Sequence, residues 1–273
     1  MSMIPYQLTV IIPTYNRLDS LAELLEALYR QSYPLFRIVL VNDAGVPVER
    51  VCALYPELDI TILNLKDNRK NAHAMNCGLE SAKSEYIMLC DDDDLLLPSH
   101  IERMLQGIGD SDLLYSDAEI VEYSLDNNRT RHPEKRFVFA YTLDLPAMRK
   151  FSTFIPSGCL YRRSLHEKIG LFDSDLYCYW DWDFFLRVAA VGSVKRLAIA
   201  GVMYAFSPTS GNQTAQHENM RPYLDRLCAK HQLGQLPTAN FFTLLSEPAV
   251  QKLKAETEIL WNGEPFIPRK NLP

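Results

Sequence analysis

The amino-acid sequence predicts an α/β fold with a mostly parallel central sheet. Four short apolar runs have the length and composition of buried strands, and they lie at residues 8–12, 36–41, 59–63 and 86–90. The segments between them have the spacing of amphipathic helices or begin with residues that cap helices. Strand and helix therefore alternate with short links, which is typical of crossover units that build a parallel sheet.

The pattern changes after residue 115. Two extended stretches, 118–123 and 129–132, flank Asp126-Asn127-Asn128, which favours a hairpin turn. Two helices are expected in the tail, near 219–231 and 248–260. We therefore expect one domain made of a parallel half and a smaller β-rich half, followed by a helical C-terminal extension, with these parts at 1–115, 116–215 and 216–273.

Composition restricts the partners and the location. The 273 residues carry a net charge of −6 without a long Lys/Arg block, which argues against a nucleic-acid partner. The six cysteines form no CxxC pair, and no apolar run has the roughly 18 to 20 residues needed to span a bilayer. The sequence therefore predicts a cytoplasmic protein with reduced thiols, and it leaves open contact with the inner face of the membrane and a homodimer.

Four aspartates, Asp91 to Asp94, directly follow the fourth predicted strand. Thr14, Tyr15 and Asp43 follow the first two strands, and the carboxyl ends of parallel strands meet at the edge of a sheet where ligands bind. Adjacent carboxylates repel one another unless a cation or hydrogen-bond donors compensate. Their oxygen atoms suit Mg²⁺ or Mn²⁺, which could neutralise charge on a leaving diphosphate. The alternative is a solvated acidic loop that caps the next helix.

A second candidate cluster combines aromatic and acidic side chains. Tyr179, Trp180 and Trp182 surround Asp181 in the sequence. Aromatic faces stack on the apolar faces of sugar rings, and a carboxylate among them can act as a general base. The alternative places both tryptophans in the core and makes Asp181 only the N-cap of the following helix.

Six segments, in this order, resemble the motifs of family 2 glycosyltransferases, which have the GT-A fold and invert the configuration of the sugar they transfer. Each segment is modest by itself, but six in the right order are highly specific. The segments are Val10–Arg17, Val41–Ala44, Asn76–Leu79, Asp91–Pro98, Gly170–Asp173 and Asp181–Arg187.

The resemblance implies roles for residues in this sequence. Asp181 would be the catalytic base, and Asp93 would bind the metal together with Asp91, with His217 as a further candidate ligand. The acceptor would lie against Tyr179, Trp180 and Trp182. The nucleotide would be held by Pro13, Thr14, Tyr15, Arg17, Asp43, Asn71, Asp91 and Asp92. Residues 1–115 would then bind the nucleotide sugar, and 116–215 the acceptor.

The function implied is metal-dependent, inverting transfer of a sugar from a nucleotide-diphosphate donor, first of all a UDP-sugar, in polysaccharide or glycoconjugate synthesis. The acceptor hydroxyl would belong to a saccharide, a lipid-linked or a protein-linked molecule. Met75 stands where the family often has arginine, and Trp180 replaces an acidic residue. These departures keep a second hypothesis open, that of an inactive carbohydrate-binding protein with the same fold. A nucleotidyltransferase is disfavoured because no glycine-rich, lysine-bearing activation loop is found.

Overall fold

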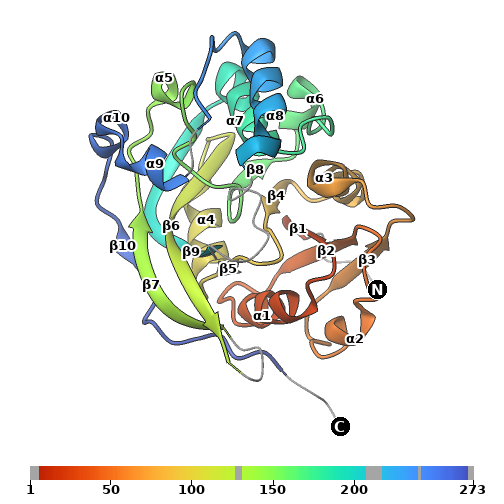
Figure 1. The fold of residues 1–273 in the computed structure, drawn as a ribbon. Helices are drawn as coiled ribbons and strands as arrows, with labels where there is room; N and C mark the ends of the chain where they lie inside the picture. The colour runs from red at the N-terminus through yellow and green to blue at the C-terminus, as the bar shows by residue number, and fades with distance from the viewer. Residues whose placement is uncertain (1–5, 127–130, 207–216, 239–240, 270–273) are drawn as a thin grey trace.

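The computed structural model describes residues 6–126, 131–206, 217–238 and 241–269, with only the backbone described for residues 217–219 and 241–243. Its strands form one sheet, and helices pack on both faces of that sheet (Figure 1). The predicted α/β class with a largely parallel sheet is confirmed.

The first half of the chain is a parallel α/β unit. Its strands pair in parallel in the order β4-β1-β2-β3. The strands are β1 (Leu8–Thr14), β2 (Phe36–Asn42), β3 (Ile60–Asn64) and β4 (Tyr86–Leu89). The helices are α1 (Leu18–Tyr29), α2 (Glu49–Cys52) and α3 (Lys70–Ser81).

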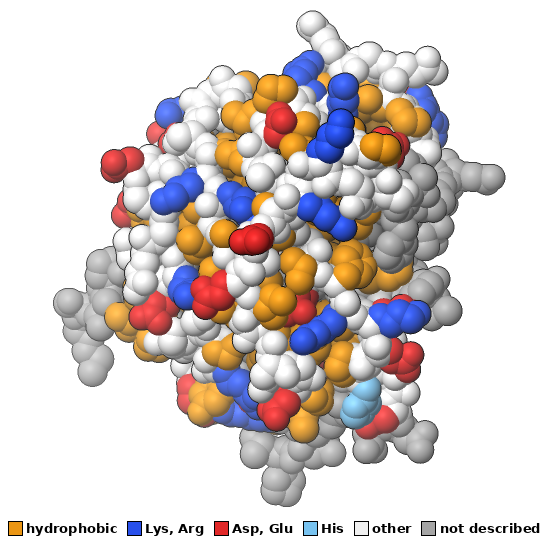
Figure 2. Space-filling view, turned by 90° about the vertical axis from the view of Figure 1, so that its left-hand side faces the viewer, with side chains coloured by type: hydrophobic (Ala, Val, Ile, Leu, Met, Phe, Trp, Pro, Cys, Tyr) orange, Lys and Arg blue, Asp and Glu red, His pale blue; other side chains and the backbone are white. Residues whose placement is uncertain are grey.

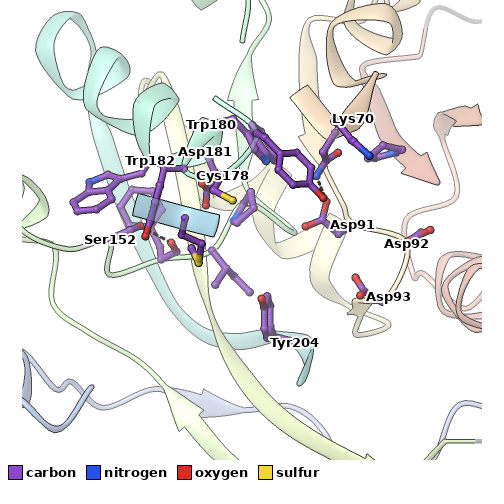
Figure 3. A pocket seen from close by; sticks show the side chains of 18 of the residues that line it. Lys70, Asp91, Asp92, Asp93, Ser152, Cys178, Trp180, Asp181, Trp182 and Tyr204 are labelled. Carbon is purple, nitrogen blue, oxygen red and sulfur yellow. Dashed lines mark hydrogen bonds between the residues drawn. The ribbon is translucent and has the colours of Figure 1, made fainter. Parts of the chain in front are cut away.

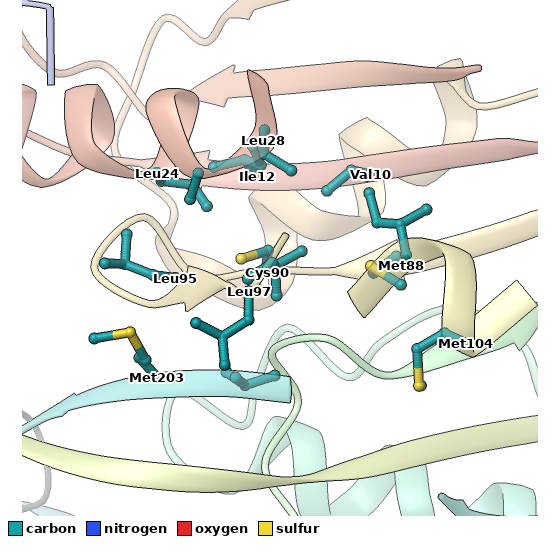
Figure 4. Close-up of a cluster of buried hydrophobic side chains, with 14 of the residues drawn as sticks. Val10, Ile12, Leu24, Leu28, Met88, Cys90, Leu95, Leu97, Met104 and Met203 are labelled. Carbon is teal, nitrogen blue, oxygen red and sulfur yellow. The ribbon is translucent and has the colours of Figure 1, made fainter. Parts of the chain in front are cut away.

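Side chains of β1 alternate between two apolar clusters, one on each face of the sheet. Val10 and Ile12 pack in the cluster that contains the leucines of α1 (Figure 4). Ile11 packs on the other face, in the cluster that contains residues of α3. Helix α3 approaches β1 so closely that a Cβ atom on Gly78 would lie 2.5 Å from Cγ2 of Ile11. A glycine at this position therefore lets α3 pack closely on this face of the sheet.

The second half extends the same sheet with antiparallel and mixed pairs. Strand β8 (Leu160–Arg162) runs antiparallel between β4 and β6 (Leu113–Leu125) and joins the two halves. Strand β6 also pairs with β7 (Arg131–Phe139) and, in parallel, with β9 (Val194–Phe206), which carries the short β5 (Leu95–Leu96). The helices of this half are α4 (His100–Ile108), α5 (Leu145–Met148), α6 (Leu165–Ile169) and α7 (Trp180–Val191).

The predicted hairpin is present, but its strands are longer than expected. Strand β6 begins at Leu113, ahead of the expected stretch 118–123, because residues 113–117 are also extended against β9. The turn residues 127–130 lie outside the described part of the chain.

The C-terminal segment is tied to both halves. It contains α8 (His217–His231), α9 (Phe241–Ser246), α10 (Pro248–Gln251) and β10 (Glu258–Ile259). The prediction of a helix over 248–260 is wrong after Gln251, because residues 258–259 pair with β9 as an edge strand. Beyond β10, Trp261 is buried in the main core, and the Arg269 guanidinium lies 4.2 Å from the ring centre of Tyr29 on α1.

On the face that Figure 2 shows, hydrophobic side chains are scattered between basic and acidic ones. Within the described residues, no helix is both long and apolar enough to cross a bilayer.

Candidate active site

A cavity of about 450 Å³ opens at the carboxyl edge of β1, β2 and β4, where the predicted site residues converge. Residues from the ends of these strands line one side, and the start of α7 lines another (Figure 3). All but one of the predicted site residues lie on its wall. The lining includes Pro13, Thr14, Tyr15, Arg17, Asp43, Asn71, Asp91, Asp92, Asp93, Tyr179, Trp180, Asp181 and Trp182.

Asp43 fixes the start of α3. Its two carboxylate oxygens accept hydrogen bonds from the backbone N–H groups of Arg69 and Lys70, at 2.9 and 2.8 Å. Lys70 has a left-handed backbone with φ of 72°, so these bonds stabilise a conformation that lysine rarely adopts. Asp43 thus positions the neighbouring Lys70, whose ammonium group lies 5.5 Å from the ring centre of Tyr177 on the cavity wall.

Two of the four consecutive aspartates, Asp92 and Asp94, are satisfied by donors of the protein itself. Asp92 accepts hydrogen bonds from the Thr14 hydroxyl at 2.7 Å and from Nη1 of Arg17 at 3.1 Å. Asp94 accepts from the Ser157 hydroxyl at 2.5 Å and from the Ala205 backbone N–H at 3.1 Å. Both side chains are buried, so their role in this structure is to hold the loop together.

The other two, Asp91 and Asp93, face the cavity. Oδ1 of Asp91 accepts from Nδ2 of Asn71 at 3.1 Å, as drawn in Figure 3, and Oδ2 of Asp93 lies 2.5 Å from Nη1 of Arg17. Burial and the negative charge of Asp93 raise the pKa of Asp91 to about 7, although Asn71 opposes the shift. Negative charge is therefore concentrated here beyond what Arg17 and Asn71 compensate.

These two carboxylates fit the chemistry of a divalent cation. Among the described residues, no group of three or more His, Cys, Asp or Glu side chains is placed to hold a metal alone. Asp91 and Asp93 can still supply hard oxygen ligands to Mg²⁺ or Mn²⁺, which commonly take their other ligands from phosphates and water. The candidate ligand His217 is the first residue of α8, and its side chain lies outside the described part.

Asp181 lies on the opposite side of the cavity from the aspartate run (Figure 3). The prediction that it is the N-cap of its helix is wrong, because α7 begins one residue earlier and Tyr179 occupies the cap position with φ of 65°. Asp181 therefore lies in the first turn, where its own backbone N–H and that of Trp182 lower the pKa of its carboxyl group. Burial outweighs them and raises that pKa above its usual value. A carboxylate that lines a cavity and has a raised pKa suits the role of a general base.

The alternative that places both tryptophans in the core is confirmed, and their contact with an acceptor stays a prediction. Trp180 and Trp182 are each 6% exposed and belong to the apolar core, yet both line the cavity. The indole N–H of Trp182 donates a hydrogen bond of 2.7 Å to the Met148 carbonyl, which fixes the ring.

Comparison with known proteins identifies the family. Residues 9–170 match the sequence model described as glycosyl transferase family 2. The chain belongs to glycosyl transferase family 2. It is a glycosyltransferase with a fold of the GT-A type.

Relatives and solved structures agree with this family. An uncharacterized glycosyltransferase of Bacillus subtilis (strain 168), YwdF, is 49% identical over 264 residues, which are 96% of this chain and 98% of that protein. The chain also resembles Staphylococcus aureus TarS 1-349 in complex with UDP-GlcNAc, with a TM-score of 0.64, 20% identity and coverage of 82% of this chain and 66% of that one. The mannosyltransferase PcManGT from Pyrobaculum calidifontis, in complex with GDP-Man and Mn²⁺, has a TM-score of 0.59, 18% identity and coverage of 86% and 67%. Structural similarity at this level of sequence identity shows the fold alone.

A buried ion cluster beside the site of this glycosyltransferase was missed by sequence reasoning. Asp183 is fully buried and accepts from Nε of Arg187 at 2.8 Å and from Nε2 of His231 at 2.7 Å, and Nζ of Lys230 lies 2.8 Å away. Burial alone would raise the pKa of Asp183, but these partners lower it to about 2. The cluster ties the end of α8 to the first turn of α7, which carries Asp181. The sequence contained no signal for it, because Lys230 and His231 belong to a distant segment.

The structure also places two other unpredicted groups at the site. The Ser157 hydroxyl accepts a 3.0 Å hydrogen bond from the Asp91 backbone N–H and donates to Asp94, so it bridges the aspartate loop. Tyr204 of β9 lines the cavity, and burial followed by the charges of Asp94, Asp93 and Asp91 raises the pKa of its hydroxyl well above the usual value. Neither residue lies in a motif that marked it in the sequence.

Proposed function

We propose that this glycosyltransferase transfers a sugar from a nucleotide-diphosphate donor to an acceptor hydroxyl with inversion of configuration, and that it requires Mn²⁺ or Mg²⁺. One observation carries the proposal. The two aspartates that face the cavity from the end of β4 and the carboxylate of Asp181 on α7 line the same cavity from opposite sides. Such an arrangement provides a place for a charged leaving group and a base for the attacking hydroxyl.

The donor would occupy the side of the cavity built from strand ends. Tyr15, which is 47% exposed, offers a ring for the nucleotide base, and Asp43 offers carboxylate lone pairs to its N–H groups. Arg17 and Lys70 bring positive charge to the diphosphate, so Lys70 supplies a cation in the region where Met75 leaves the family's arginine absent. Among the similar structures, TarS is in complex with UDP-GlcNAc and the mannosyltransferase with GDP-Man, which supports a nucleotide sugar with UDP as the first choice.

The cation would be held by Asp93 and Asp91, whose oxygen atoms suit it. When bound, it supplies positive charge that stabilises the departing diphosphate. Arg17 already pairs with Asp93 and with Asp92, so it keeps this loop in place before the donor arrives.

The reaction is one displacement. The acceptor oxygen forms a bond with the anomeric carbon while the bond from that carbon to the diphosphate oxygen breaks, and the leaving oxygen keeps the electron pair. The acceptor proton passes to the Asp181 carboxylate, whose raised pKa makes it a better base than an exposed aspartate. Attack from the face opposite the diphosphate inverts the configuration. The product would enter polysaccharide or glycoconjugate synthesis.

Calorimetric titration with UDP, with and without Mn²⁺, tests the donor part of the proposal. UDP should bind at least about tenfold more tightly with Mn²⁺, and Asp93→Asn should remove this difference. UDP affinity that is the same with and without Mn²⁺, and the same in Asp93→Asn as in the wild type, would overturn the donor part of the proposal. Release of UDP from UDP-sugars, rather than pyrophosphate, then separates a transferase from an inactive binding protein and from a nucleotidyltransferase.

A further inference from the structure

The cavity continues past Asp181 into a part whose wall is mainly apolar. Ser152 and Trp182 lie on one side of Asp181, and Asp91 to Asp93 lie on the other (Figure 3). We call the apolar wall that the loop after α5 and the C-terminal segment contribute to this cavity the acceptor arm, and define it by Phe151, Ile155, Leu224, Leu236, Pro237 and Leu244. It lies next to the base of the proposed reaction, on the side away from the donor.

Two chain segments outside the first half of the domain build the acceptor arm. The loop after α5 supplies Phe151 and Ile155, and the C-terminal segment supplies the other four residues. Leu224 of α8 is packed in the same apolar cluster as Trp182, while Leu244 of α9 packs against the cluster that contains Phe151. The C-terminal segment, which the family match at 9–170 does not reach, is thus part of the wall of the active site.

Two polar groups near the acceptor arm already have partners. The Ser152 hydroxyl donates to the Phe154 carbonyl at 2.7 Å, and the Trp182 indole N–H donates to the Met148 carbonyl at 2.7 Å. A saccharide placed in this arm would lose hydrogen bonds to water and regain few from these groups, which is costly. A hydrocarbon loses nothing and gains contact with leucine and phenylalanine side chains. These two groups therefore favour a hydrocarbon over a chain of sugars in the acceptor arm.

Building on the proposed function, we propose that the acceptor is lipid-linked, with its hydroxyl at Asp181 and the adjoining hydrocarbon in the acceptor arm. Lys150 also lines the cavity and is exposed, so an anionic group next to the hydrocarbon would meet a positive charge. The apolar wall belongs to the cavity itself and is continuous with Asp181. On the face drawn in Figure 2, by contrast, hydrophobic and charged side chains are mixed.

Alkyl glucosides of increasing chain length provide the probe. Each is titrated, below its critical micelle concentration, into the full chain saturated with UDP and Mn²⁺, and the dissociation constant is measured by calorimetry. Affinity should rise with chain length by about fourfold for each methylene that the acceptor arm buries, and then level off. Methyl glucoside should not bind measurably. Affinity that does not depend on chain length, or saturable binding of free oligosaccharides or peptides in place of the alkyl glucosides, would overturn the proposal.

Two variants test whether the acceptor arm is the binding place. Leu236→Gln and Leu244→Gln alter partly exposed side chains of the arm, so both should fold. Each should weaken octyl glucoside binding at least about tenfold. Leu171→Gln is the matched control, because Leu171 is 46% exposed and lies outside the cavity wall, and it should leave binding unchanged. Unchanged octyl glucoside affinity in both arm variants would contradict the proposal.

Titration with UDP in the same samples separates two failures. If UDP and Mn²⁺ bind as expected but the alkyl chain has no effect, only the lipid-linked acceptor is wrong. If UDP does not bind, the donor site itself is wrong, and the proposed function fails with it.

Discussion

The two sides of the cavity differ in how the chain builds them. The donor side comes from the ends of β1, β2 and β4, and its side chains are polar, acidic and held by a network of short hydrogen bonds. The acceptor arm comes from a loop and from the C-terminal segment, and its wall is mainly apolar. The donor side is thus fixed by the geometry of the sheet, whereas the acceptor arm depends on how distant segments pack onto it. One fold can keep the first and vary the second.

The largest effect is expected from Asp181, which lies between the two sides. Asp181→Asn should lower the rate of sugar transfer on the order of 10³-fold, because a positioned base is lost, while affinity for UDP stays the same. The rate is measured as UDP release in the presence of an acceptor that the wild-type protein glycosylates. Asp110→Asn is the control, since Asp110 is exposed at the end of α4. Full activity in Asp181→Asn would remove this residue from the chemistry.

On the donor side, we expect substitutions of Asp93 and Asp94 to have different effects on activity, UDP affinity and stability. Asp93→Asn should lower transfer on the order of 100-fold and weaken UDP binding in Mn²⁺, because a carboxylate that faces the cavity is lost. Asp94→Asn should instead reduce the melting temperature and leave UDP affinity within about threefold, since Asp94 is bonded to Ser157 and Ala205 inside the protein. Equal losses of UDP affinity in both variants would show that Asp93 and Asp94 do not have separate binding and structural roles.

The sequence was sufficient to predict which residues meet at the strand-end side of the cavity, because its signals there are local. Apolar runs of strand length mark the sheet, and the residues that follow them must meet at its carboxyl edge. The cap position at Tyr179 was missed because a left-handed tyrosine has no sequence signature. The sequence predicts that residues 116–215 bind the acceptor, but it could not predict which residues build the acceptor arm. Its leucines have no common spacing with Phe151, and only packing in three dimensions brings them together.

Asp183 of α7 should matter for stability because it joins this helix to the end of α8. Asp183→Asn leaves Arg187 without its negative partner, while Lys230 keeps Asp173, and breaking a buried ion pair costs about 3 kcal/mol in the free energy of unfolding. Chemical denaturation measures it. The matched control is Asp175→Asn, whose pair with Arg226 is exposed, and its cost should stay below about 1 kcal/mol. Equal costs in the two variants would show that the buried cluster is not a tether.

A smaller effect is expected from pH in the absence of divalent cations. The pKa of Asp91 is raised to about 7, so the folded state binds this proton more tightly than the unfolded state does. The stabilisation is complete below the unfolded pKa near 4 and is lost as pH rises through about 7, with a slope of at most about 1.4 kcal/mol per pH unit. Compared with wild type, Asp91→Asn should lose less stability in thermal melts between pH 5.5 and 7.5. Parallel curves of stability against pH for the two proteins would refute the raised pKa of Asp91.

The pKa values of His100 and His166 are lowered to about 4 by burial, so their contribution has the opposite sign and grows as pH rises from 4 to 6.5. The wild type and Asp91→Asn both keep these histidines. The difference between their curves of stability against pH therefore isolates the contribution of Asp91.

The central claim is that the strand-end side of the cavity holds a nucleoside diphosphate through the carboxylates of Asp91 and Asp93. A crystal structure determined with UDP and Mn²⁺ tests it most directly. We expect the cation within bonding distance of an Asp93 oxygen and of both phosphates, with the uracil ring against Tyr15. Density for UDP elsewhere, or a cation bound without either aspartate, would contradict the account.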